Sequence, residues 1–230
     1  MTDAAALQTI HDKRWPGESA AYREARDGLL RAEMELRRQT ERVAALRRAL
    51  PPGGAIPQDY VFEEGADARK VGLSELFGDK ETLLLYSYMY GPKMARPCPS
   101  CSSMLDGLDG EAKHITQRVA LAVVARSPIA RVLAAGAERG WRNLRLISSA
   151  NNSYHADYNS ESPEGDQRPI LNVFSRKGGE IRHVWASELA FAPMEPGQDP
   201  RHIDQMWPLW AALDFTPGGR GDFRPQLEYA

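Results

Sequence analysis

The spacing of apolar positions separates a long polar helix from the rest of the chain. Residues 18–50 are mostly charged, and their apolar residues recur every seven positions, at Leu29, Leu36, Val43 and Leu50. This pattern predicts a helix with one narrow apolar face. The sequence Pro51-Pro52-Gly53-Gly54 then ends the helix, because prolines and glycines interrupt helices. We therefore expect an N-terminal helical arm at residues 1–54 and a folded domain at residues 55–230.

In the domain, apolar runs alternate with helix-compatible stretches. The runs that predict strands lie at residues 60–62, 69–71, 83–90, 119–124, 144–147, 170–175 and 180–185. Helical stretches lie at residues 74–78, 102–118, 128–139 and 199–213, the last of them broken or bent around Pro208. Ser127 is expected to cap the third of these, with Pro128 in its first position. This order predicts an α/β fold, a three-layer sandwich whose mixed sheet carries helices on both faces.

Both cysteines of the chain lie in one short motif, Cys98-Pro99-Ser100-Cys101. The motif follows an apolar run and a Gly91-Pro92 turn and leads into a helical stretch, so it is expected at the N-terminus of a helix. Free N–H groups and the positive end of the helix dipole lower the pKa of a thiol there from about 8.5 toward roughly 3.5–7.5. The spacing predicts that Cys98 attacks as the nucleophile and that Cys101, one turn later, resolves the mixed disulfide.

Two structural roles for the cysteine pair compete with a redox role. A structural zinc site needs four ligands, and the chain's histidines, at positions 11, 114, 155, 183 and 202, form no pair with the usual spacing. We therefore expect no metal site. A structural disulfide between residues so close in sequence would constrain the unfolded chain little. Redox chemistry is the better explanation for a lone C-x-x-C motif.

Composition limits the classes of partner and the compartment. The 230 residues carry a net charge of −2 and are 42% hydrophobic, and no apolar run approaches the length of about 18 residues that a membrane span needs. The first residues resemble no secretion signal. We expect a cytoplasmic protein that binds neither nucleic acid nor membrane.

The order of elements resembles the thioredoxin fold in its peroxiredoxin-like elaboration. In this resemblance, Arg168-Pro169-Ile170-Leu171-Asn172-Val173-Phe174 corresponds to the thioredoxin segment that begins with a cis-proline and enters the final hairpin. The resemblance implies that Pro169 is a cis-proline facing the cysteines. Pro169, Arg168, Pro99 and Ser100 are then expected to border the substrate groove.

A closer resemblance is to the thioredoxin-like family called domain of unknown function 899, whose members are described as predicted dithiol-disulfide oxidoreductases. It covers nearly the whole chain, including the arm. The residues that carry it are Tyr86-Ser87-Tyr88-Met89-Tyr90-Gly91-Pro92, Cys98-Pro99-Ser100-Cys101-Ser102, Asp106-Gly107-Leu108-Asp109-Gly110, Ala125-Arg126-Ser127-Pro128, Gly140-Trp141 and Leu213-Asp214-Phe215-Thr216-Pro217.

The residues around the cysteines differ from those of better-known relatives. Thioredoxins have W-C-G-P-C and a buried aspartate on the preceding strand, whereas residues 83–90 contain no carboxylate. The proton acceptor for Cys101 is therefore left unassigned. Arg96 is close enough in sequence to stabilise the Cys98 thiolate, although a surface arginine would contribute nothing there.

The sequence therefore predicts a thiol-disulfide oxidoreductase that acts on a protein or small-molecule disulfide. No cofactor is expected beyond the dithiol, with an external thiol or reductase as electron donor. One alternative is an interaction module with structural or regulatory thiols, with the arm allowing a homodimer. Another is a weak thiol peroxidase assisted by Arg168. Against it, the proline and hydroxyl positions of the peroxiredoxin signature hold Gly91 and Ala95 before Cys98, and Met94 and Cys98 before Cys101.

The polar segment Asn151–Asn159 is rich in hydrogen-bonding side chains. Such a segment could line a substrate cleft, but surface loops commonly have the same composition. We expect a loop there.

Overall fold

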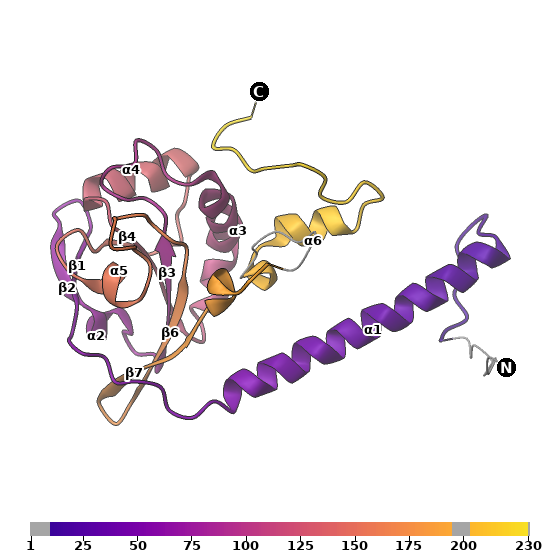
Figure 1. The fold of residues 1–230 in the computed structure, drawn as a ribbon, viewed down its shortest axis with the longest axis horizontal. Coiled ribbons are helices and arrows are strands. Elements are labelled where there is room, and N and C mark those ends of the chain that lie inside the picture. Colours follow the sequence, from indigo (N-terminus) through magenta and orange to yellow (C-terminus); the bar gives the residue numbers. More distant parts are fainter. Residues whose placement is uncertain (1–9, 195–202, 230) are drawn as a thin grey trace. The chain divides into compact units, whose positions relative to one another are not determined.

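The chain divides into two compact units, Met1–Pro51 and Pro52–Ala230. The computed structural model describes residues 10–194 and 203–229, drawn as a ribbon in Figure 1. The first unit contains helix α1 (Ala20–Arg48). Ser19 caps this helix by accepting a hydrogen bond from the Tyr22 N–H, at 3.1 Å. Its last turn carries Arg47 and Arg48, where positive charge complements the helix dipole.

The second unit contains a mixed sheet of seven strands. The strands are β1 (Val61–Glu64), β2 (Arg69–Gly72), β3 (Thr82–Tyr88), β4 (Ala120–Ala125), β5 (Leu146–Ser148), β6 (Leu171–Lys177) and β7 (Glu180–Ala186). The α-helices are α2 (Leu73–Leu76), α3 (Pro99–Ile115), α4 (Ile129–Arg139), α5 (Tyr154–Asp157) and α6 (Pro208–Asp214). Two 3₁₀ turns, η1 (Glu188–Phe191) and η2 (Asp204–Met206), lie between β7 and α6.

The strand order is β2-β1-β5-β4-β3-β6-β7. β3, β4 and β5 are parallel neighbours, whereas β6 runs antiparallel to β3 and β7 antiparallel to β6. The centre of the sheet is therefore a strand-helix-strand unit followed by a hairpin, and the antiparallel β1–β2 hairpin extends it beyond β5. This is an α/β fold whose central strand order is thioredoxin-like, as the sequence predicted (Figure 1).

Alternation along β3 assigns its side chains to two separate cores. Leu83 and Leu85 belong to the core formed with α2 and α5. Tyr86 and Tyr88 belong to the core formed with α3 and α4. Since successive side chains of a strand point to opposite faces, one strand anchors both layers. Tyr86 and Tyr88 therefore lie on the face that α3 covers.

Local chemistry fixes the ends of several elements. Pro99 occupies the first position of α3, where its missing N–H costs nothing. Gly140 ends α4 with φ of 73°, a conformation that glycine adopts without steric cost. The β6–β7 turn places Gly178 and Gly179 at φ of 57° and 84°, which suits a tight hairpin turn.

Three details of the sequence interpretation need correction. Helix α4 begins at Ile129 and its cap is Pro128, because Ser127 instead hydrogen-bonds the chain at Tyr90 and Gly91. A shorter helix, α6, begins at Pro208, so the late helix expected at residues 199–213 is broken there, which was the alternative to a bend; residues 199–202 of that expected helix lie outside the described residues. The polar segment expected as a loop contains the helical turn α5.

Candidate active site

The two cysteines lie at the N-terminal end of α3, directly after the loop that follows β3. Cys98 is the cap residue and is half-buried, whereas Cys101 lies in the first turn and is only 3% exposed. Both are free thiols. This difference in exposure matches the roles predicted from the spacing, with Cys98 accessible and Cys101 inside.

The pKa values of the two thiols shift in opposite directions. The pKa of Cys98 is lowered to about 6, first by a hydrogen bond from the Cys101 thiol and then by the N–H groups of Cys101 and Ser100, against the opposing effect of burial. Its sulfur makes no close capping hydrogen bond. Burial raises the pKa of Cys101 well above its usual value, and the neighbouring Cys98 raises it further. At neutral pH the arrangement therefore favours a Cys98 thiolate beside a protonated Cys101.

Hydroxyl groups surround the cysteine pair on its buried side. The Tyr88 hydroxyl hydrogen-bonds Ser102 Oγ at 2.6 Å, and Ser102 Oγ donates to the Cys98 carbonyl at 2.9 Å. Tyr86 shares the core under α3 with Cys101, and burial raises the pKa of Tyr86 well above its usual value. Sequence reasoning assigned these residues no role, although strand periodicity alone would have placed Tyr86 and Tyr88 on the face of the following helix.

The loop before Cys98 is fastened to α4. Ser127 donates its N–H to the Tyr90 carbonyl at 2.9 Å and its hydroxyl to the Gly91 carbonyl at 3.1 Å. The Arg131 guanidinium lies 4.6 Å from the centre of the Tyr90 ring. Its N–H groups donate to three carbonyls of the loop, those of Pro92, Met94 and Ala95. These contacts fix the backbone that leads into Cys98.

Arg96 does not face the thiolate. Its exposed guanidinium pairs with Glu138 at 2.7 Å and with Glu228 at 2.8 Å, and Arg96 is not among the groups that shift the Cys98 pKa. The contacts therefore give no support to Arg96 as a thiolate-stabilising residue. Its sequence proximity to Cys98 was misleading because the side chain extends toward carboxylates elsewhere on the domain.

Pro169 lies beside the end of β3. The Ser87 N–H donates to the Ile170 carbonyl at 2.8 Å, and the register continued by one residue places Pro169 opposite Tyr88. No peptide bond among the described residues is cis, so the expectation of a cis-proline at position 169 is wrong. The trans isomer of an X–Pro bond is favoured by about 0.5–1 kcal/mol. The expectation of a cis bond came from the resemblance alone, without a known contact that would reverse this preference.

The other residues expected at the groove lie at the surface. Arg168 is exposed, and its guanidinium lies 5.8 Å from the centre of the Phe191 ring. Pro99 is exposed and Ser100 half-buried, both in the first turn of α3. Pro99 and Ser100 thus adjoin Cys98, whereas Arg168 contacts η1.

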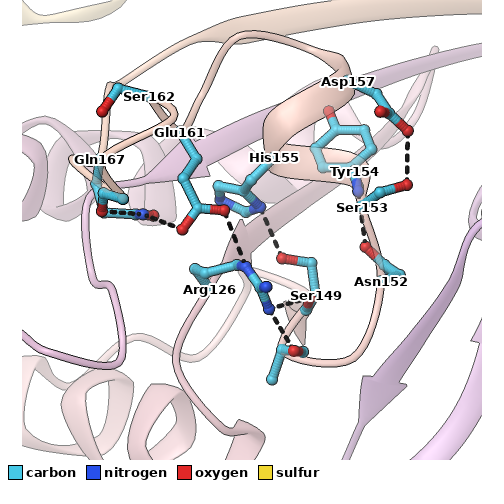
Figure 2. Close-up of polar contacts among 12 residues, drawn as sticks. Arg126, Ser149, Asn152, Ser153, Tyr154, His155, Asp157, Glu161, Ser162 and Gln167 are labelled. Atoms are coloured by element: carbon cyan, nitrogen blue, oxygen red, sulfur yellow. Dashed lines mark hydrogen bonds and ion pairs between the residues drawn. The ribbon is translucent and has the colours of Figure 1, made fainter.

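Within the polar segment Asn151–Asn159, Tyr154 and His155 are buried, whereas most of the other residues are exposed. Figure 2 shows the His155 ring directed at Ser149, and the Nδ1–Oγ distance is 2.6 Å. His155 is 1% exposed. Arg126 joins this network by donating to Glu161 at 3.1 Å and to the Ser149 carbonyl at 3.0 Å. The segment's polar side chains therefore include a buried network that connects β4, β5 and α5.

Within residues 10–194 and 203–229, no cluster of three or more histidine, cysteine, aspartate or glutamate residues could hold a metal ion. No helix in the same part of the chain combines the length and hydropathy of a membrane span.

A family model described as "Bacterial protein of unknown function (DUF899)" matches residues 13–229. The chain belongs to the DUF899 family. This membership confirms the family resemblance inferred from the sequence motifs. The match includes the cysteine motif and helix α1 of this DUF899 protein. No curated protein sequence matches the chain.

Several solved structures are similar to this DUF899 protein. A hypothetical protein from Sinorhizobium meliloti 1021 is 20% identical, with 68% of this chain and 81% of that chain covered and a TM-score of 0.44. Peroxidoxin BcpB from Mycobacterium tuberculosis is 14% identical over 71% of this chain and 98% of its own, with a TM-score of 0.46. Reduced Prx3 from Vibrio vulnificus, in complex with H2O2, is 12% identical over 70% and 95%, with a TM-score of 0.46.

Proposed function

We propose that this DUF899 protein is a thiol-disulfide oxidoreductase. The observation that carries the proposal is the placement of two free thiols one helical turn apart at the start of α3, with Cys98 accessible and Cys101 buried. The opposite shifts of their pKa values support it, because they favour a Cys98 thiolate beside a protonated Cys101 at neutral pH. A thiolate attacks disulfides, whereas a thiol does not. The partial exposure of Cys98 allows a substrate to reach it.

The proposed reaction has two exchange steps. The Cys98 thiolate attacks one sulfur of a substrate disulfide, which forms a mixed disulfide and releases the first substrate thiolate. Cys101 then loses its proton and attacks the Cys98 sulfur, which forms the Cys98–Cys101 disulfide and releases the second substrate sulfur with a proton. Two electrons pass from the dithiol to the substrate. An external thiol or reductase returns them, and no other cofactor takes part.

The site offers little for peroxide reduction by the peroxiredoxin route. Ala95 stands where that route needs a hydroxyl, and the Arg168 guanidinium lies over Phe191. The substrate we propose is a protein or small-molecule disulfide, bound beside Pro99, Ser100 and Pro169. The proposed compartment is the cytoplasm, where thiol systems would keep the dithiol reduced.

Trapping the mixed disulfide tests the proposal. Cys101→Ser is expected to form a mixed disulfide with a model disulfide such as hydroxyethyl disulfide and to accumulate it, detected by mass spectrometry. Cys98→Ser is the matched control and is expected to form none, because Cys101 is buried. If both variants turn over the disulfide like the wild-type protein, and Cys98 titrates as an ordinary thiol, the redox proposal is wrong and the interaction module becomes the better hypothesis.

A further inference from the structure

The backbone of Cys98 is held by hydrogen bonds on both of its sides. Its N–H donates to the Met89 carbonyl, just after β3, at 3.0 Å. Its carbonyl accepts two hydrogen bonds from Ser102 of α3, from the N–H at 3.0 Å and from the hydroxyl at 2.9 Å. The residue after Cys98 is a proline, which has no N–H that could hold the chain there. Ser102 is therefore the residue through which α3 fastens its own cap.

Tyr88 extends this contact into a chain of two hydroxyls. Its hydroxyl lies 2.6 Å from Ser102 Oγ. A serine hydroxyl has a single hydrogen, and that of Ser102 is donated to the Cys98 carbonyl, which can only accept. Tyr88 is therefore the donor to Ser102, and the chain runs in one direction, from Tyr88 through Ser102 to Cys98. Hydrogen bonds arranged in this way polarise and strengthen one another.

Both hydroxyls lie where water does not replace them. Tyr88 and Ser102 are each 0% exposed, and the Tyr88 ring packs edge-on against Trp141, with the ring centres 5.7 Å apart. A buried hydroxyl without a partner is costly. The adjacent serine bonds elsewhere, since Ser103 Oγ accepts from Trp207 Nε1 at 3.3 Å. The contact from Ser102 to Cys98 is thus a buried and oriented one.

We propose that Ser102, oriented by Tyr88, is a positioning residue that aligns Cys98 with Cys101 for the second exchange step. This inference rests on the proposed disulfide exchange. In that step the Cys101 sulfur bonds the Cys98 sulfur, and the bond from Cys98 to the substrate sulfur breaks. The departing substrate sulfur takes the electron pair of that bond and the proton that Cys101 loses. Ser102 and Tyr88 keep their own protons throughout.

Alignment matters because a disulfide forms only within a narrow geometry. The two Cα atoms must lie about 4.4–6.8 Å apart, and the two halves of the bond must be twisted by about 90°. Cys101 is fixed by its place in the first turn of α3, whereas Cys98 precedes the helix as its cap. A Cys98 backbone with more freedom would adopt the reactive arrangement less often, which lowers the effective concentration of Cys101. Attack of Cys98 on an external disulfide needs no such alignment.

The reaction of the reduced protein with one equivalent of 5,5′-dithiobis(2-nitrobenzoate) separates the two steps. Attack by Cys98 releases the first coloured thiolate, and attack by Cys101 on the mixed disulfide releases the second, so stopped-flow absorbance shows two phases. Ser102→Ala is expected to leave the first phase within about threefold of wild type and to slow the second about five- to tenfold, because a hydrogen bond to the Cys98 carbonyl is lost.

Thr116→Val is the matched control at the other end of the same helix. The Thr116 hydroxyl donates to the Ala112 carbonyl at 2.8 Å, so it makes the same kind of contact, to the carbonyl four residues earlier, as Ser102 makes to Cys98. Its loss should leave both phases within about twofold of wild type, because neither residue contacts a cysteine backbone.

A double variant distinguishes positioning from a role in stability alone. Ser102→Ala leaves the buried Tyr88 hydroxyl without its partner, so it should lower the urea midpoint of unfolding. Adding Tyr88→Phe removes that orphaned hydroxyl and should restore part of the lost stability, because removing both partners of a hydrogen bond costs less than removing one. The second phase should nevertheless stay as slow as in Ser102→Ala, because the Cys98 carbonyl lacks the hydroxyl in both proteins.

The outcomes separate this inference from the proposed function. An unchanged second phase in Ser102→Ala, or equal slowing in Ser102→Ala and Thr116→Val, overturns the positioning role and leaves disulfide exchange standing. A second phase that recovers together with stability in the double variant overturns it as well. Release of only one coloured thiolate by the wild-type protein, with no Cys98–Cys101 disulfide formed, overturns the exchange reaction itself and the positioning role with it.

Discussion

Cys98 owes its acidity to its neighbours, and chiefly to the thiol of Cys101. We expect the alkylation rate of the wild-type protein to rise with pH through about 6 and to level off above it, because the thiolate is the reactive form. Replacement of Cys101 by Ala removes the largest favourable contact, so the midpoint should move toward that of an ordinary thiol, about 8.5. Iodoacetamide rates between pH 4 and 10 would measure both midpoints.

Cys101→Ser is the companion variant, since a hydroxyl can still donate to the Cys98 sulfur. Its midpoint should lie between those of the wild-type protein and Cys101→Ala. A wild-type midpoint near 8.5, or identical midpoints for all three proteins, would contradict the assignment of Cys101 as the principal donor.

His155 couples folding to pH at a distance from the sulfur chemistry. Burial, and then the charge of Arg126, lowers the pKa of His155 to about 3, against 6.5 as its ordinary value. Between pH 3 and pH 6.5, His155 carries a proton in the unfolded chain but not in the folded protein. Stability is therefore complete above pH 6.5 and falls as the pH drops toward 3, by up to about 1.4 kcal/mol per pH unit from this group.

His155→Asn is expected to flatten this dependence, because asparagine keeps a polar atom near the Nδ1 position and does not titrate. Urea unfolding at pH 7 and pH 5 would measure the difference in free energy of unfolding. The control is His114→Asn, at an exposed position of α3, which should keep the wild-type slope. Equal slopes for the wild-type protein and His155→Asn would show that His155 is not the titrating group.

At the scale of elements, α4 positions the cysteine loop through Arg131. Arg131→Leu removes the donors to three loop carbonyls and the contact with the Tyr90 ring. We expect the free energy of unfolding to fall by about 1–3 kcal/mol and the alkylation of Cys98 to slow. Chemical unfolding and alkylation rates at pH 7.5 would measure the two effects.

Arg142→Leu serves as the control for charge and size, because Arg142 is exposed and its substitution should change the stability by no more than about 0.5 kcal/mol. Arg131→Lys keeps the charge but cannot span three carbonyls with a planar fork, so it should recover only part of the loss. If Arg131→Leu behaved like Arg142→Leu, the loop would not depend on α4.

The elements were predictable because their signals are local. Apolar runs marked the strands, and glycines and prolines marked the ends of elements, as at Gly140 after α4 and the Gly178-Gly179 turn. The turn α5 was missed because its four residues are too short for a helical period and its polar composition is typical of loops. The cap of α4 was misplaced because Ser127 bonds a loop 36 residues earlier, which no local pattern reveals.

The candidate site was predictable only in part, for the same reason. Spacing and helix position identified Cys98 and Cys101 and the order of their roles. The direction of a long side chain depends on tertiary contacts, so Arg96 was assigned by sequence proximity although it pairs with Glu138 and Glu228. The isomer of the bond before Pro169 likewise depends on its surroundings. The hydrogen bonds from Tyr88 to Ser102 and from Ser102 to the Cys98 carbonyl became visible only once strand and helix were placed together.

At the scale of the whole molecule, the apolar stripe of the helical arm contains exposed leucine side chains. Leu29, Leu36 and Leu50 of this stripe are 50%, 68% and 51% exposed. Among the described residues of α1, only Arg23 is buried. Most helices gain their stability by packing an apolar face. We propose that the stripe packs against the same stripe of a second copy, over a short contact because Gln39 interrupts the repeat.

A charge in the stripe should separate such a dimer. Leu36→Lys places an ammonium group at the centre of the proposed contact, where its desolvation is costly, so the variant should sediment as a monomer at concentrations where the wild-type protein is a dimer. Met34→Lys is the matched control, because Met34 is a partly exposed apolar residue of α1 that lies off the seven-residue stripe. Analytical ultracentrifugation across a hundredfold range of concentration would distinguish them. A wild-type protein that is monomeric throughout, or two variants that dissociate equally, would show that the stripe does not join two copies.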